Sequence, residues 1–166
     1  MTLAKVKNLY DQDFALWIEK TVKQLKSGDL SQVDLENLIE EVASLGRRDK
    51  RELKNRLIIL FEQALKRRYL LLSDCYRGWK VTIKRCQSKL KDILKDSPSL
   101  CSFLTDICDD CYQEAVENMR IEYDAIFPDF CPFSKDIDGL LNHNFWQKKN
   151  ILTPNPSGEL PSLDYH

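Results

Sequence analysis

The sequence predicts an all-α fold, a single-domain bundle of about five main helices followed by a short C-terminal helix. Its 166 residues are the length of one ordinary domain, and 43% of them are hydrophobic. Apolar residues recur at spacings of three and four along most of the chain, whereas no run of alternating polarity predicts a strand. Five Gly and six Pro punctuate these stretches, and no Pro comes before Pro98. Because Gly often ends a helix and Pro cannot continue one, these residues mark the expected helix boundaries.

Two amphipathic helices are predicted in the first part of the chain. The first covers about residues 13–26, where Asp11 or Asp13 can cap the start and Gly28 follows the end. Its apolar stripe comprises Phe14, Trp17, Ile18, Val22 and Leu25. The second begins after Ser31 and ends at Gly46, and its apolar stripe comprises Leu35, Leu38, Ile39, Val42 and Leu45. Stripes of this kind are the faces that helices turn toward a core.

Two longer helices follow, and their apolar positions suit the core of a bundle. The third covers about residues 49–71, with an inner face of Leu53, Leu57, Leu60, Phe61, Ala64 and Leu65. The fourth follows Gly78 and covers about residues 79–94. Its apolar positions alternate in steps of four and three, which is the narrow seam typical of helix bundles. They are Trp79, Ile83, Cys86, Leu90 and Ile93.

The fifth helix has the clearest start signal in the chain. Ser97 is a good capping residue, and Pro98 suits the first helical position. We expect this helix to extend to about residue 124, with an apolar side of Cys101, Leu104, Ile107, Cys108, Cys111, Ala115 and Met119. The aromatic segment 127–133 predicts a non-helical crossing that packs on the bundle, and a short helix is expected over residues 134–141.

Charge is unevenly distributed along the chain, although the net charge is only -1. Residues 1–46 carry five Lys or Arg against eight Asp or Glu, a net charge of -3. Residues 47–95 carry sixteen against five, a net +11, and residues 96–166 carry four against thirteen, a net -9. The third and fourth helices are therefore strongly basic. The candidate interaction residues on them are Arg47, Arg48, Arg51, Arg77, Lys80, Lys84 and Lys91.

Two interpretations of these basic helices are open. In the first, they face the acidic helices and water, so that internal ion pairs neutralise a solvated surface. In the second, they bind a phosphate backbone or an acidic partner. The sequence pI of about 6.1 weighs against nucleic acid, because the acidic segments would repel it. The chain also contains no helix-turn-helix, zinc-finger or RNA-recognition signature.

Catalytic chemistry finds little support in the sequence. The six Cys are spread over helices in a chain without an export signal, which favours core thiols over disulfides. Cys108 and Cys111 have metal-ligand spacing, yet no second such pair accompanies them. Glu114 and Glu117 could face a divalent metal, although a solvated acidic face is the favoured interpretation. With no glycine-rich phosphate loop, we predict no catalytic residue, no cofactor and no metal, and a metal-dependent helical phosphohydrolase is only the third hypothesis.

Five stretches of the chain resemble a known family. They are Leu9-Tyr10-Asp11-x-Asp13-Phe14-x-x-Trp17, Asp34-Leu35-Glu36-Asn37-Leu38-Ile39-Glu40-Glu41-Val42-x-Ser44-Leu45-Gly46, Trp79-x-x-Thr82-Ile83, Asp96-Ser97-Pro98-Ser99-Leu100 and Phe127-Pro128-x-x-Cys131-Pro132-Phe133. In this order they resemble the helical family named domain of unknown function 29, which is abundant in cyanobacteria. The resemblance covers residues 9–146 and implies an all-α fold and a cyanobacterial source, but no activity. We expect a helical domain over residues 9–146 and a flexible tail over residues 147–166, where Pro is frequent.

Three acidic residues in the second of these stretches are not required by core packing. Glu36 and Glu40 share a helix face, and Glu41 lies about 100° around the helix from Glu40. We expect these three residues to pair with the basic residues that follow Gly46. A metal or substrate site is the alternative.

The leading functional hypothesis is a non-enzymatic interaction or regulatory domain. Its partner would be an unidentified protein or a second copy of the chain in a small homo-oligomer. The alternative is a nucleic-acid-binding protein that uses the basic helices at about residues 47–95. No apolar run approaches the roughly 20 residues of a membrane span, and the first residues lack a secretory signal. We therefore expect a cytoplasmic protein that does not act in a membrane.

Overall fold

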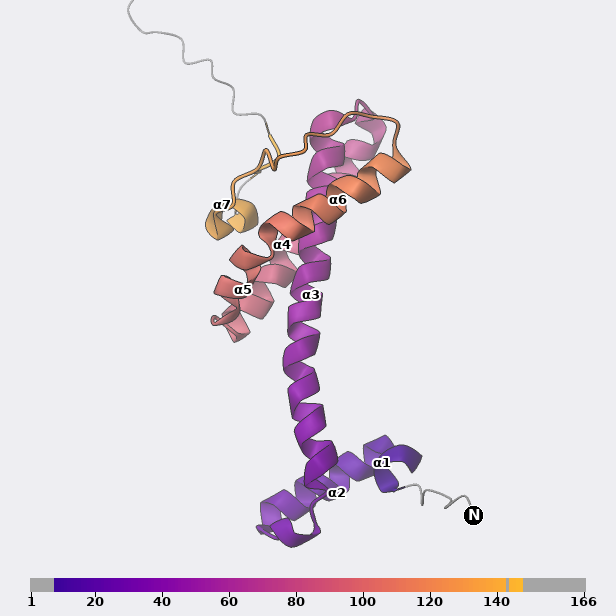
Figure 1. Cartoon of the computed structure of the whole chain (residues 1–166), viewed down its shortest axis with the longest axis vertical. Helices are drawn as coiled ribbons and strands as arrows, with labels where there is room; N and C mark the ends of the chain where they lie inside the picture. Colours follow the sequence, from indigo (N-terminus) through magenta and orange to yellow (C-terminus); the bar gives the residue numbers. More distant parts are fainter. Residues whose placement is uncertain (1–7, 143, 148–166) are drawn as a thin grey trace, which may run out of the picture. The chain divides into compact units, whose positions relative to one another are not determined.

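The structure, a computed structural model, describes residues 8–142 and 144–147 (Figure 1). Within these residues it contains helices and no strand, so the all-α prediction is confirmed. None of the helices described is both long enough and apolar enough to cross a membrane. Apart from Gln147, the predicted tail at 147–166 lies outside the described residues. The chain divides into two compact units, Met1–Glu52 and Leu53–His166, which are termed the first and second units below.

The first unit contains two helices that precede the long helix α3. The short helix α1 (Leu9–Gln12) is one that the sequence analysis missed, because four residues cannot show a periodic pattern. In α2 (Phe14–Ser27), Asp13 caps the start by accepting a hydrogen bond from the Leu16 amide at 3.0 Å. Gly28 ends α2 with a φ of 75°, the left-handed conformation that Gly adopts at least cost. Both predicted ends of this helix are confirmed.

The long helix α3 (Leu35–Tyr69) is 35 residues in length and follows the 3-10 turn η1 (Leu30–Gln32). The predicted break at Gly46, with a new helix beginning near residue 49, is wrong. One Gly inside a helix costs roughly 0.5–1 kcal/mol, which the neighbouring residues can offset. The residues after Gly46 are mainly Arg, Lys and Glu, which are good helix formers, and no Pro interrupts them.

The second unit has a core that matches the predicted inner faces of its helices. All six residues predicted for the inner face of α3, from Leu53 to Leu65, are 0% exposed. Four of the five seam residues of α4 (Tyr76–Asp96) are also buried, and Trp79 packs half-buried against the same core. The helix α4 follows the 3-10 turn η2 (Ser73–Cys75) and passes through Gly78, so the predicted boundary at Gly78 is wrong.

The predicted fifth helix is two helices, α5 (Leu100–Asp106) and α6 (Cys108–Glu122), which meet at Ile107. The predicted start, with Ser97 as the cap and Pro98 as the first helical residue, is wrong: Ser97 is the C-cap of α4, and α5 begins at Leu100 after Ser99, which makes no side-chain capping bond. Ser97 and Pro98 instead form the turn between the two helices, where the Leu100 amide donates to the Ser97 carbonyl at 3.0 Å. The short C-terminal helix is α7 (Ile137–Asn142). It begins three residues later than predicted.

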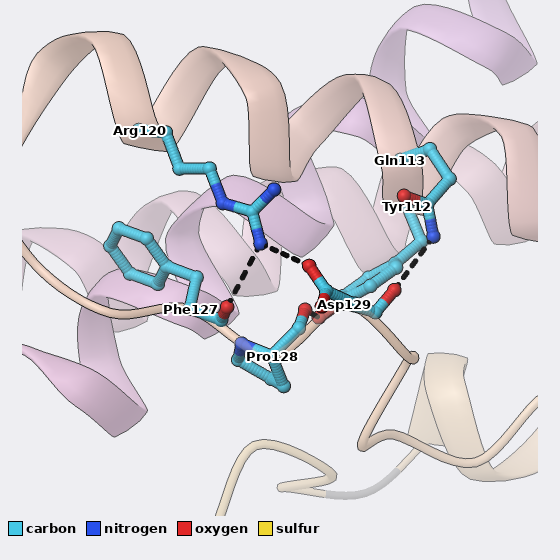
Figure 2. Close-up of polar contacts among 6 residues, drawn as sticks. All are labelled: Tyr112, Gln113, Arg120, Phe127, Pro128 and Asp129. Carbon is cyan, nitrogen blue, oxygen red and sulfur yellow. Dashed lines mark hydrogen bonds and ion pairs between the residues drawn. The ribbon is translucent and has the colours of Figure 1, made fainter.

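The segment between α6 and α7 packs on the core as predicted. Phe133 is buried and stacks on Phe61, with 6.1 Å between ring centroids. Figure 2 shows three side chains of α6 that also hold the segment, namely Tyr112, Gln113 and Arg120. The Tyr112 hydroxyl donates to the Pro128 carbonyl at 2.7 Å, and the Arg120 guanidinium donates to Asp129 Oδ1 at 2.5 Å. This non-helical segment is therefore fixed by both apolar and polar contacts.

Candidate interaction surfaces

The structure divides the seven predicted basic residues between the two units. The three on α3 in the first unit are Arg47, Arg48 and Arg51. The four on α4 in the second unit are Arg77, Lys80, Lys84 and Lys91. All seven side chains are exposed. They belong to two different helical segments and are considered as two groups.

The exposed side of α4 carries a row of cations that we term the α4 ridge. It comprises Arg77, Lys80, Lys84, Arg85 and Lys91. An open surface hollow of about 400 Å³ follows the ridge and is lined by Arg77, Lys80, Val81, Lys84, Arg85 and Ser88. Arg85 was not among the predicted candidates, although it directly follows Lys84 in the sequence. The aliphatic stems of these long side chains, together with Val81, give the hollow apolar walls beneath the charges.

Two cations of α3 in the second unit, Lys54 and Lys66, differ from those of the ridge in having acidic partners. Lys54 pairs with Glu114 at 3.0 Å, and Lys66 pairs with Glu122 at 3.1 Å. The hydrogen bond to Glu114 raises the pKa of Lys54 above its usual value. For the five ridge side chains, no ion pair is found with any residue in the described part of the chain. Internal neutralisation thus accounts for the basic residues of α3 that face α6, but not for those of α4.

The three acidic candidates lie in the first turns of α3, and two of them have partners in the first unit. Glu40 forms an ion pair, at 2.5 Å, with Arg47, one of the basic residues that follow Gly46. Glu41 accepts a hydrogen bond from the Tyr10 hydroxyl at 2.5 Å, and this bond raises the pKa of Tyr10. Glu36 is exposed in the first turn of the helix. This arrangement ties α1 to α3 and does not gather the three carboxylates.

The first unit exposes an apolar surface that the sequence analysis did not predict. Four side chains of α2 are 41–46% exposed, and four of α3 are 49–67% exposed. These eight residues are termed the apolar face and are Phe14, Ile18, Val22, Leu25, Leu35, Ile39, Val42 and Leu45. The expectation that both stripes point into a core is wrong for these residues. Helical periodicity shows that a helix is amphipathic, but it does not show what covers the apolar side.

A family model matches most of the chain. The model of the Domain of unknown function DUF29 matches residues 9–146. The chain belongs to the DUF29 family. No curated protein and no solved structure matches this DUF29 chain. The matched range contains the α4 ridge and the apolar face, so both surfaces are parts of the DUF29 domain.

The described part of the DUF29 domain contains no group of three or more His, Cys, Asp or Glu side chains that could hold a metal ion. Cys108 and Cys111, which have metal-ligand spacing, are buried. Burial raises the pKa of Cys108 to about 11 and that of Cys111 to about 12. Both are therefore neutral thiols at neutral pH and pack as small apolar side chains.

Proposed function

We propose that this DUF29 protein is a non-enzymatic interaction protein that binds an anionic partner through the α4 ridge. The observation that supports the proposal is the absence of acidic partners for the ridge in the described residues, whereas Lys54 and Lys66 have such partners. A row of like charges repels itself in the free protein. An anionic partner relieves that repulsion when it binds, and the positive field of the row also speeds its association with the protein.

A nucleic acid is the second candidate, as a specific kind of anionic partner. At 1.5 Å per residue, the ridge extends about 21 Å from Arg77 to Lys91. Single-strand phosphates spaced about 3.4 Å apart would place roughly six charges along this length. The hypothesis of a metal-dependent phosphohydrolase gains no comparable support, because Glu114 is paired with Lys54.

The test compares two double variants that remove the same charge from different places. The ridge variant is Lys80→Ala with Lys84→Ala, and the matched control is Lys54→Ala with Lys135→Ala. Lys54 and Lys135 are exposed but already paired with acidic residues. Fluorescence anisotropy would measure binding to duplex DNA, duplex RNA and a poly-glutamate peptide at about 50 and 200 mM salt, a range that reveals phosphate contacts.

We expect binding that weakens with salt. The affinity should fall about tenfold or more in the ridge variant and change little in the control. For a nucleic acid, the slope of log K against log salt should fall by about two in the ridge variant, one for each phosphate contact. Stronger binding of poly-glutamate than of either duplex would exclude the nucleic-acid candidate. Equal losses in both variants, or no binding of any probe at low salt, would overturn the proposal.

A further inference from the structure

We infer that the α4 ridge recognises its anionic partner as an acidic α-helix that lies lengthwise along α4. This inference rests on the proposed function, because it names the class of partner for the same surface. The residues that line the hollow follow one another along α4 in steps of three, one, three, one and three positions. They are Arg77, Lys80, Val81, Lys84, Arg85 and Ser88. The lining therefore consists of two overlapping sets of four residues, each with the spacing i, i+3, i+4 and i+7.

Each of these sets has the form of a hole that receives one side chain of a facing helix. When two helices pack lengthwise, a side chain of one inserts as a knob between four neighbouring residues of the other. The first hole extends from Arg77 to Lys84, and the second extends from Val81 to Ser88. Their centres are four residues apart, which is about 6 Å along the axis at 1.5 Å per residue. Side chains at positions i and i+4 of a second helix have the same separation.

The floor of the two holes suits an apolar knob. Val81 belongs to both holes and is 44% exposed. Ser88 is a small residue at the end of the second hole, and the aliphatic stems of Lys84 and Arg85 form walls between them. An apolar side chain such as Leu gains free energy when it covers this surface, whereas a phosphate group gains none. The floor therefore favours a helix over a nucleic acid.

The rim of the same holes requires negative charge. Four of the six lining residues are cations, and α4 contains no acidic residue before Asp92. Lys91 continues the line of Arg77 and Lys84, because each step is seven residues, or about 10.5 Å along the axis. These cations have no ion pair with any residue in the part of the chain that the structure describes. A helix with Glu or Asp beside its apolar knobs, repeated every seven residues, matches this order of charges.

The experiment compares two designed peptides of identical composition by fluorescence anisotropy with the full chain at about 50 mM salt. The probe peptide is an Ala-rich helix with Leu at positions i and i+4 and with Glu on both sides of the Leu pair. In the control peptide one Leu is exchanged with the Ala at i+2, so that the two Leu side chains point to opposite sides. Far-UV circular dichroism checks that both peptides are equally helical. We expect the probe peptide to bind about tenfold more tightly, because only its two Leu side chains can enter both holes.

A variant of the floor separates recognition of a helix from simple attraction of charge. Val81→Gln keeps the net charge and introduces a good helix former at an exposed site. It should weaken binding of the probe peptide about tenfold and leave binding of poly-glutamate and of the duplexes unchanged. The matched control is Ile121→Gln on α6, where an 87% exposed Ile is replaced and binding of the probe peptide should persist.

The possible failures of this inference differ from a failure of the proposed function. Equal binding of the two peptides, or an unchanged affinity of the probe peptide for Val81→Gln, would overturn the inference. The proposed function would stand in that case if Lys80→Ala with Lys84→Ala still weakened binding of the anionic probes. Tighter binding of a duplex than of the probe peptide would identify a nucleic acid as the partner and would also overturn the inference. If no peptide and no duplex bound at low salt, the proposed function itself would be wrong.

Discussion

The two units of this chain are built from similar amphipathic helices, yet they bury very different amounts of apolar surface. The second unit gathers 25 buried residues into one core cluster. The first unit buries Trp17, Thr21 and Val33 among its described residues, and it leaves the apolar face in water. The helical periodicity of α2 and of the first part of α3 is as clear as that of the buried helices. The difference shows that an apolar stripe needs a second layer before it becomes a core.

This contrast also separates stability from binding. A helix packed on several sides contributes to the free energy of folding, whereas an exposed stripe contributes mainly when a partner covers it. The same substitution should therefore lower the free energy of unfolding by different amounts in the two units. The following predictions test that statement, beginning with the largest effect.

The largest effect is expected from Phe61→Ala in the second unit. Phe61 is 0% exposed, stacks on Phe133, and meets Tyr112 edge to face with 5.7 Å between the Phe61 and Tyr112 ring centroids. Removing such a ring costs about 3–5 kcal/mol, which is a large part of the stability of a typical domain. The matched variant Phe14→Ala removes the same ring from a 46% exposed site in the first unit. Thermal and urea unfolding should show a much smaller loss for Phe14→Ala, and equal losses would contradict the contrast between the units.

The second prediction uses the thiols, which all lie at Cys75 or beyond and so report on the second unit. At mildly alkaline pH a thiol reagent should label the exposed Cys75 quickly and the buried Cys86, Cys108 and Cys111 slowly. Denaturant should make all six reactive. Rapid labelling of the three buried thiols in the native protein would show that the core is open, contrary to its burial.

The same thiols make the second unit sensitive to high pH. Burial raises the pKa of Cys108 to about 11 and that of Cys111 to about 12, from an ordinary value of 9.0. A raised pKa means that the fold favours the neutral thiol, so this stabilisation is complete below about pH 9 and is lost as the pH rises through 11 to 12. The free energy of unfolding should fall over that range. The double variant Cys108→Ala with Cys111→Ala should show a smaller fall in the free energy of unfolding with rising pH.

Local signals in the sequence predicted the helix ends that depend on one residue and its neighbours. The end at Gly28 was identified correctly, and the cap was narrowed to Asp11 or Asp13, of which Asp13 is the one used, because a capping side chain and a left-handed Gly act within one turn. The inner face of α3 from Leu53 was also correct, since a complete core covers it. The break at Gly46 was wrong because a Gly permits a helix end without requiring one. The single helix predicted for residues 98–124 was wrong because no Gly or Pro marks the break at Ile107 in the sequence.

The candidate surfaces were only partly predictable, because exposure and pairing are tertiary properties. The basic character of α4 was clear from charge counting. That Lys54 and Lys66 would be neutralised by α6, while the α4 ridge would not, depends on how the helices pack. The exposure of the apolar face could not be predicted for the same reason, since an apolar stripe that packs in a core and one that faces water have the same spacing in the sequence.

The smallest effect concerns two glycines, and it tests whether α3 is continuous in solution. A Cβ at Gly46 or at Gly28 would meet no heavy atom within 4 Å, so neither substitution by Ala causes a clash. Gly28 has a φ of 75°, whereas Gly46 lies inside α3 without positive φ. Gly28→Ala should therefore lower the free energy of unfolding by about 1 kcal/mol through backbone strain, and Gly46→Ala should raise it by about 0.5–1 kcal/mol. Urea unfolding followed by far-UV circular dichroism measures both. If Gly46→Ala were destabilising like Gly28→Ala, Gly46 would end a helix in solution, and the first part of α3 would be a separate helix.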